Sequence, residues 1–367
     1  MAKQALAAVF LGKGKPLEIQ SFDIPELRAG ELLVRVICCT VCGSDLHTYE
    51  GRRSSPTPTI LGHEIMGRIA ALPEGENVAD VEGRPLKIGD RITWSIAANC
   101  GDCFYCGHDL PAKCDSLFKY GHEAIDSIHP LSGGLAEFCH LAAGTAVVQI
   151  PKVLSDVVAS PANCATATVA AALRVGGGCT GEVVLIQGAG MLGLSATAMA
   201  ATLGAAEVIV CDVDNDRLEQ ASRFGASQAI CVADGTDALN ETIGRLTAGR
   251  GVDLAIELSG SPASIASGLA ELRIGGRYVL VGSVFPSPDI PISAEWIVRR
   301  WLNIHGVHNY APRDLATAIA FLGNTHQKYP FSELVAASFP LAEAEAAFQY
   351  AIEKRPHRVA LLPATDE

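Results

Sequence analysis

The feature that most constrains the fold is an alternation of apolar strands and helices that begins at Val183. The run VVLIQ is followed by the glycine turn GAGMLG, the helical segment LSATAMAATLG and the strand EVIVCD. Further helices are expected at 217–224 and 238–246, and further strands in SQAICV, VDLAIELSG and GRYVLVGS. Apolar strands joined by helices form parallel sheets that are covered on both faces. The segment 153–296 is therefore predicted to be a doubly wound α/β domain.

The flanking segments have a different pattern. Residues 1–152 are predicted to be β-rich, with strands in LLVRVI and GRIAAL and a turn in KIGDRI that leads into another strand, and helical periodicity is nearly absent before about Ser155. In the segment 297–367, helices are expected at 315–322 and 342–351, and RVALLP is expected to be a strand that returns to the first domain. A chain of 367 residues is too long for a single hydrophobic core, so two domains are expected.

Charge and cysteine usage exclude several kinds of partner. The net charge of -12 argues against nucleic-acid binding, which needs a basic face. No apolar run is long enough to span a bilayer, and the opening MAKQALAAVF does not resemble a signal peptide. Because four of the twelve cysteines are bunched at a metal-like spacing, thiolates on a metal in a reducing cytoplasm are favoured over disulfides. A cytoplasmic protein without nucleic-acid or membrane partners is expected.

The four bunched cysteines follow the pattern C-x2-C-x2-C-x7-C within residues 98–116, at Cys100, Cys103, Cys106 and Cys114. Four thiolates this close in sequence can surround Zn²⁺ tetrahedrally with no open position, which is typical of a structural site. An iron–sulfur cluster uses similar spacing, but it often has a proline after the last cysteine and a different final gap. Here Asp115 follows, and the segment GDCFYCGHDLPAKC is too polar for a buried core.

A second candidate metal site begins with Cys42 and His63, because thiolate and imidazole donors suit zinc. More polar groups crowd the first ligand than a structural site needs: Ser44, Asp45 and His47. Cys164 is the candidate third ligand, since it lies among small residues just before the α/β domain. A ligand there would place the metal in the cleft between domains. Considered alone, Cys164 would be interpreted as a small buried hydrophobe.

The turn GAGMLG matches a dinucleotide-binding motif because it follows a strand and opens a helix. Gly188 is expected to make the tight turn, Gly190 to let a pyrophosphate approach the backbone, and Gly193 to let the helix meet the strand. Asp212, nineteen residues beyond Gly193, would accept hydrogen bonds from the ribose hydroxyls and repel a 2′-phosphate. This pattern favours NAD over NADP.

Together these motifs resemble the zinc-dependent alcohol dehydrogenases of the medium-chain dehydrogenase/reductase superfamily, and the resemblance covers essentially the whole chain. It implies a GroES-like catalytic domain built from both chain ends, with a Rossmann domain inserted between them. It also implies two Zn²⁺ per chain: a catalytic zinc on Cys42, His63 and Cys164, with Glu64 close by, and a structural zinc on the four bunched cysteines. Such enzymes transfer hydride between a small-molecule alcohol and NAD, giving an aldehyde or ketone, and are usually dimeric or tetrameric homo-oligomers.

The resemblance also suggests roles for single residues. Ser44 matches the hydroxyl that binds the substrate oxygen, and His47 the imidazole that passes the proton to solvent, although a histidine in a loop is more often a surface residue. Asp45 matches the carboxylate that orients the histidine ligand, and a loop-capping aspartate is an equal alternative. Three further positions match cofactor contacts: Thr168 on the nicotinamide, Arg217 beside the adenosine ribose and Arg358 on the pyrophosphate. Both arginines could equally be solvated surface charges.

Fewer residues bear on the identity of the substrate. Gly43 stands where some alcohol dehydrogenases have a cation. Small residues occur at this position in the polyol and threonine dehydrogenase branches, so a polyol or threonine-type activity is the alternative. The stretch VCGSDLHTYEGRRSSPTPTILGHE, with Arg52, Arg53 and the run FKYGHE, resembles a branch associated with phosphonate catabolism. That resemblance suggests a hydroxyalkyl-phosphonate substrate. A zinc- and NAD-binding sensor or structural subunit without turnover is the alternative from another class, although such a protein would not need Ser44 and His47.

Overall fold

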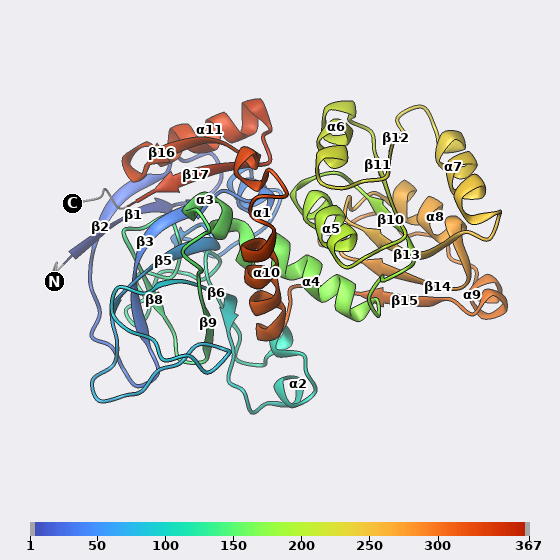
Figure 1. The fold of residues 1–367 in the computed structure, drawn as a ribbon. Helices are drawn as coiled ribbons and strands as arrows, with labels where there is room; N and C mark the ends of the chain where they lie inside the picture. Colours follow the sequence, from blue (N-terminus) through green and yellow to red (C-terminus); the bar gives the residue numbers. More distant parts are fainter. Residues whose placement is uncertain (1–3, 364–367) are drawn as a thin grey trace. The chain divides into compact units, whose positions relative to one another are not determined.

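The computed structural model describes residues 4–363 and divides the chain into two compact units (Figure 1). The first unit holds the described residues up to Ala167, together with Asn309–His326 and those from Phe331 onward. The second unit holds Thr168–His308 and Gln327–Pro330. Within residues 4–363, none of the helices combines the length and hydropathy needed to cross a bilayer.

The unit boundaries lie beyond those predicted at 152/153 and 296/297. The first differs because α3 (Asp156–Ala159) and η2 (Ser160–Asn163) pack against strands of the first unit. The second differs because α9 (Ala294–Arg300) packs on the sheet of the second unit and β15 (Asn303–Gly306) belongs to that sheet. In both cases the segment belongs to the unit whose sheet buries its apolar side.

The first unit is built on β-sheets. A three-stranded antiparallel sheet has the order β2-β1-β4, from β1 (Gln4–Phe10), β2 (Glu18–Asp23) and β4 (Thr59–Ile60). The eight-stranded sheet follows the path β16-β17-β3-β5-β6-β7, while β8 pairs with β3 and β9 with β6. Its strands are β3 (Leu32–Thr40), β5 (Glu64–Ala71), β6 (Arg91–Ala98), β7 (Phe118–Lys119), β8 (Phe138–Leu141), β9 (Thr145–Gln149), β16 (Val335–Pro340) and β17 (Arg358–Leu362).

The central strand β3 has the sequence LLVRVICCT, in which most side chains are buried. β-branched and other apolar side chains fit such a two-sided buried surface. The C-terminal strand β17 pairs antiparallel with it, Ala360 opposite Thr40 and Leu361 opposite Cys39. This pairing brings the end of the chain into the first unit, where the sequence expects it.

The second unit contains a six-stranded sheet in which every neighbouring pair is parallel, with the order β12-β11-β10-β13-β14-β15. In sequence order this is 3-2-1-4-5-6, the doubly wound order of Rossmann domains. The strands are β10 (Val183–Gln187), β11 (Glu207–Asp212), β12 (Gln228–Cys231), β13 (Val252–Glu257), β14 (Leu272–Leu280) and β15. The predicted α/β fold class, with a β-rich domain and a Rossmann domain, is confirmed.

Helices connect these strands and cover the sheet (Figure 1). Helices α5 (Met191–Thr202) and α6 (Asn215–Arg223) pack near β10, β11 and β12, while α8 (Pro262–Glu271) packs near β13 and β14. The remaining helical elements are α4 (Ala165–Val175), α7 (Asp237–Thr247), α10 (Pro312–Thr325), η3 (Phe331–Leu334), η4 (Leu341–Glu343) and α11 (Ala344–Lys354).

The sequence missed the helical elements of the first hundred residues and of the cysteine segment. These are α1 (Gly43–Tyr49), α2 (Phe104–Gly107) and the 3-10 turn η1 (Pro111–Lys113). Elements of two turns or less are too short to show a helical period, so the expectation of almost no helix before Ser155 was wrong at these places. As a result His47 lies on a helix and not in a loop.

Candidate functional site

Four potential metal-binding side chains converge in the first unit: Cys42, His63, Glu64 and Cys164. Their ligand atoms all lie within 4.8 Å of one another, and three of the four residues are buried. Two thiols, an imidazole and a nearby carboxylate are a donor set that fits zinc. With Cys42, His63 and Cys164 as the protein ligands, a fourth position would remain for an oxygen donor, as in catalytic zinc sites.

Each ligand is positioned by a different element. Cys42 lies two residues after the end of β3 and is the N-cap of α1, while His63 directly precedes β5. Cys164 follows η2, and that turn is held by the buried Asn163. The Asn163 amide donates to the backbone carbonyls of His63, at 3.0 Å, and Trp94, at 2.9 Å. One side chain therefore fixes the segment of one ligand against that of another.

Asp45 serves both roles that the sequence left open. One carboxylate oxygen accepts from the Cys42 N–H at 2.9 Å and so caps α1. The other lies 3.2 Å from His63 Nδ1. Because a carboxylate can only accept, Nδ1 carries the proton and the lone pair of Nε2 is available to a metal. A capping aspartate and an orienting aspartate are here the same residue.

Glu64 is fully buried and paired with Arg358. The guanidinium donates to both carboxylate oxygens at 2.6 Å, and the Thr40 hydroxyl adds a third hydrogen bond, also at 2.6 Å. Burial raises the pKa of Glu64 to about 7, and the charge of Arg358 opposes this rise. The same guanidinium lies 3.6 Å from Cys42 Sγ. Arg358 is thus a neighbour of the metal-binding cluster, and its contact with a pyrophosphate stays a prediction.

The electrostatics of the cluster favour a thiolate at Cys42. A hydrogen bond from the Cys164 thiol holds the pKa of Cys42 well below its usual range in spite of burial, and the Arg358 charge acts in the same direction. Zinc binds deprotonated cysteine, so a site that already stabilises one thiolate needs to release fewer protons when the metal binds.

Ser44 and His47 lie on one face of α1, three residues apart. The Ser44 hydroxyl is 3.4 Å from His63 Nε2, the nitrogen available to a metal. Burial lowers the pKa of His47, and the Arg52 charge contributes further. His47 is therefore neutral near pH 7 and able to accept a proton. Their parts in proton transfer stay predictions.

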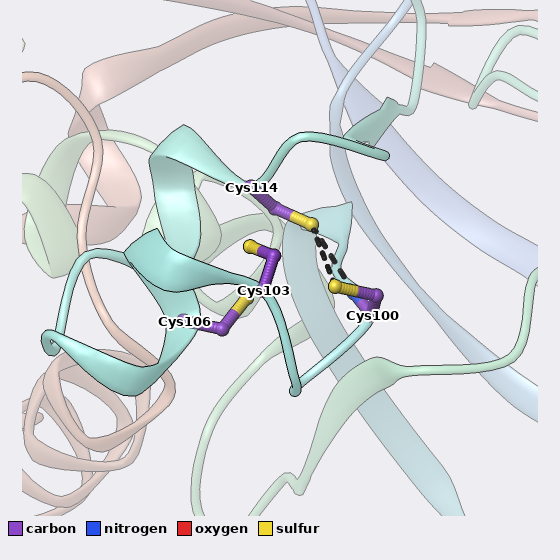
Figure 2. Close-up of side chains that lie close together, drawn as sticks. All are labelled: Cys100, Cys103, Cys106 and Cys114. Carbon is purple, nitrogen blue, oxygen red and sulfur yellow. Dashed lines mark hydrogen bonds between the residues drawn. The ribbon is translucent and has the colours of Figure 1, made fainter.

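The four sulfur atoms of Cys100, Cys103, Cys106 and Cys114 also lie within 4.8 Å of one another (Figure 2). Backbone N–H groups point at them: those of Cys100 and Ser116 donate to Cys114 Sγ at 3.2 and 3.3 Å. N–H groups of Asp115 and Cys106 lower the pKa of Cys103 to about 6. Four thiols with N–H donors around them fit a tetrahedral zinc with no open position.

In the second unit, the three motif glycines have the expected surroundings. Gly188 has φ +100°, and a Cβ on Gly193 would lie 1.8 Å from the carbonyl oxygen of Gly188. A Cβ on Gly190, the N-cap of α5, would meet nothing within 4 Å. Asp212 ends β11, and its carboxylate accepts from the N–H of Ala189 at 2.6 Å. The turn thus leaves room for a phosphate at Gly190, with Asp212 beside it.

The other predicted cofactor contacts are less constrained. Arg217 lies on α6, half exposed, with its guanidinium 3.7 Å from the Asp214 carboxylate one turn earlier. Thr168 is buried on α4. Both roles stay predictions.

Three residues that hold the metal-binding side chains in place were not predicted from the sequence: Asn163, Thr40 and Ser160. The Ser160 hydroxyl donates to the backbone carbonyl of Glu64 at 2.8 Å. The sequence feature that could have indicated them is a polar residue inside an otherwise apolar stretch.

Comparison with known proteins identifies the class to which this fold and site belong. The alcohol dehydrogenase GroES-like domain matches residues 28–152, and the zinc-binding dehydrogenase family matches residues 192–324. The 5-exo-hydroxycamphor dehydrogenase of Pseudomonas putida is 30% identical over 94% of this chain and 95% of its own. The sorbitol dehydrogenase of Bacillus subtilis is 32% identical, over 84% and 83%.

Among solved structures, an alcohol dehydrogenase of Thermotoga maritima superimposes with a TM-score of 0.92 at 30% identity, covering 99% of this chain and all of that one. The class is that of the zinc-binding dehydrogenases. The chain belongs to the zinc-dependent alcohol dehydrogenases of the medium-chain dehydrogenase/reductase superfamily.

Proposed function

We propose that this enzyme is an NAD-dependent alcohol dehydrogenase with a catalytic zinc on Cys42, His63 and Cys164 and a structural zinc on the four-cysteine segment. The convergence of two thiols, one imidazole and Glu64 within 4.8 Å carries the proposal. When bound there, zinc supplies Lewis acidity that lowers the pKa of the substrate hydroxyl.

The protein's own groups have defined tasks in this proposal. Asp45 holds the His63 ring in the orientation and tautomer that a metal needs. The Ser44 hydroxyl, close to His63 Nε2, accepts the proton of the alcohol and passes it toward His47. Arg358 opposes the protonation of the buried Glu64 and binds both of its carboxylate oxygens. When bound at the glycine turn of the second unit, NAD would supply the hydride acceptor, and the product would be an aldehyde or ketone.

NAD is proposed over NADP because Asp212 lies beside the glycine turn, where its charge repels a 2′-phosphate. Asp212→Ala is expected to raise the Kd of NADH, since ribose hydrogen bonds are lost, and to lower the Kd of NADPH. Fluorescence titration of both cofactors measures this. An unchanged preference between the two cofactors would remove the reason for naming NAD.

For the substrate we propose a hydroxyalkyl-phosphonate, on the resemblance of the segment around Arg52 and Arg53. A polyol is the second candidate, and the similarity to a sorbitol dehydrogenase favours it.

We also propose that the protein is a homo-oligomer, because β15 is an edge strand of the parallel sheet. Exposed apolar side chains lie near this strand: Trp301, Val298 and Ile274. We propose the cytoplasm as its compartment, since the twelve cysteines are free thiols.

The test is a substrate panel with the zinc content measured in parallel. Metal analysis should find two zincs per chain, and the purified enzyme should reduce NAD with hydroxyphosphonates, polyols or simple alcohols. Two bound zincs without turnover of any alcohol would favour a sensor or structural subunit over an enzyme of this specificity.

A further inference from the structure

A second imidazole packs behind the candidate metal ligand His63. The rings of His63 and His122 have centroids 5.1 Å apart. His122 Nδ1 lies 2.8 Å from the Tyr120 carbonyl oxygen, which can only accept, so Nδ1 carries the hydrogen. His122 Nε2 is then an acceptor, and the Arg53 guanidinium donates to it at 2.9 Å. A neutral histidine therefore holds the arginine one side chain away from the metal cluster.

A second cation lies in the same place. Lys119 ends β7, three residues before His122, and is half-buried. Burial and the Arg53 charge lower its pKa, whereas the thiolates of Cys164 and Cys42 act in the opposite direction. The charges of Arg53 and of these thiolates thus act on the ammonium group of Lys119. Burial is the largest cause that lowers the pKa of His122, and the charges of Lys119 and Arg53 lower it further.

The two cations have no acidic partner in the part of the chain that the structure describes: no ion pair forms at the side chain of Arg53 or of Lys119 between residues 4 and 363. The nearby Glu123 carboxylate accepts from the Lys119 backbone N–H at 2.9 Å. The neighbouring Arg52, in contrast, is paired with Glu50. The side chains of Arg53 and Lys119 can therefore both bind an anion that a ligand carries.

The nearby carboxylates have other partners. Arg358 pairs with Glu64, Asp45 binds His63, and Glu123 accepts from the backbone N–H of Lys119. The side-chain donors of both cations are therefore left for a ligand. Arg53 uses one of its five N–H donors on His122, so four remain, and Lys119 has three. A guanidinium group with unused N–H donors and an ammonium group can together bind the oxygens of a phosphonate, phosphate or carboxylate.

We propose that Arg53 and Lys119 form a subsite for an oxyanion group carried by the alcohol substrate, beside the Cys42–His63–Cys164 cluster. His122 positions Arg53 in it. The inference rests on the proposed dehydrogenase function for its choice of ligand, and it assigns the anion specificity to two residues that can be tested separately from turnover.

The first experiment measures binding without turnover. Methylphosphonate and acetate, which carry no hydroxyl group, are titrated calorimetrically into the zinc-loaded full-length enzyme. Arg53→Gln and Lys119→Gln are compared with Arg52→Gln, which removes the same charge at the next position. We expect the Kd of the anion to rise about tenfold to a hundredfold in the first two variants, as for a lost charge-assisted hydrogen bond. It should stay within about twofold in Arg52→Gln.

The second experiment uses 2-hydroxyethylphosphonate, 3-hydroxypropionate and 1-propanol as substrates at pH 8. Arg53→Gln and Lys119→Gln should raise KM for the anionic alcohol and leave that for 1-propanol unchanged, and Arg53→Lys should recover part of the loss. A preference for the phosphonate over the carboxylate, or the reverse, identifies the anion.

Equal anion binding in all variants, or none in the parent enzyme, would overturn the subsite. If no alcohol is oxidised but methylphosphonate binding still depends on Arg53 and Lys119, the dehydrogenase proposal fails and the subsite stands. If 1-propanol is oxidised as well as the anionic alcohols and no variant changes their KM, the function stands and the subsite fails.

Discussion

At the candidate metal site, single atoms define what each side chain can do. His63 can offer Nε2 because Asp45 takes the hydrogen of Nδ1, and Cys42 is held as a thiolate by Cys164 and Arg358. Ser44 lies next to the same nitrogen. Cys139 lacks such neighbours, and burial raises the pKa of its thiol.

This contrast makes a prediction for zinc content. Cys42→Ala should lose one of two zincs together with alcohol oxidation, because two protein ligands hold zinc poorly. Cys139→Ala is the matched control, since it removes a buried thiol outside the cluster and should keep both metals. Elemental analysis of the purified variants decides the matter, and two zincs in Cys42→Ala would exclude the site.

A second prediction concerns pH. The pKa of His47 lies below its usual value of about 6.5 because of burial and the Arg52 charge, and only the neutral ring can accept a proton. The kcat/KM for alcohol oxidation should thus be constant above that pKa and fall as pH drops through it. In Arg52→Gln the fall should begin at higher pH, since a neighbouring cation is lost. His47→Gln should remove this dependence and reduce kcat about a hundredfold; an unchanged profile would show that His47 takes no part.

At the scale of elements, the glycine turn separates two functions that the sequence motif combines. Gly193 is needed for packing, because any Cβ would collide with the backbone at Gly188. Gly190 faces open space, so its lack of a side chain serves something outside the protein. Its φ of -73° suits any residue, so conformational freedom is not the reason for this glycine.

The two glycines therefore predict opposite results. Gly193→Ala should lower the melting temperature of the second unit, because α5 must move away from β10. Gly190→Ala should leave the melting temperature unchanged and raise the Kd of NADH at least tenfold, since its methyl group would occupy the place of the pyrophosphate. Calorimetry and NADH fluorescence measure the two effects. Equal loss of stability in both variants would contradict this division.

At the scale of the first unit, one buried ion pair links the two ends of the chain. Arg358 opens the last strand, β17, and binds Glu64 at the start of β5, and both side chains are at least nine-tenths buried. Breaking a buried pair leaves an uncompensated charge, which costs about 3–5 kcal/mol.

Arg358→Met should accordingly lower the free energy of unfolding of the first unit by about 3 kcal/mol in urea denaturation. The double variant Glu64→Gln/Arg358→Met should recover part of that loss, because no buried charge remains. Arg299→Met is the control, as its pair with Glu295 is exposed and should contribute little. A single variant as stable as the parent would show that β17 is held by strand pairing alone.

The parts of the fold and site that the sequence predicted depend on local pattern. The strands and helices from Val183 onward are visible because each element spans several periods of its own. The four cysteines lie within fifteen residues, so their spacing already restricts them to one site. The short helix α1, which carries Ser44 and His47, was not predictable from periodicity because seven residues make only two turns.

By itself the sequence determined the kinds of donor, their local spacing and the α/β alternation. Only the tertiary structure decided that Cys42, His63 and Cys164 meet, that Arg358 joins Glu64 from the C-terminal strand, and that His122 and Arg53 lie next to His63. The reason is physical: these contacts come from the pairing of β3 with β5 and β17 and from the packing of η2 on them. Strand pairing over such separations is set by the burial of whole sheets, which no short stretch of sequence specifies.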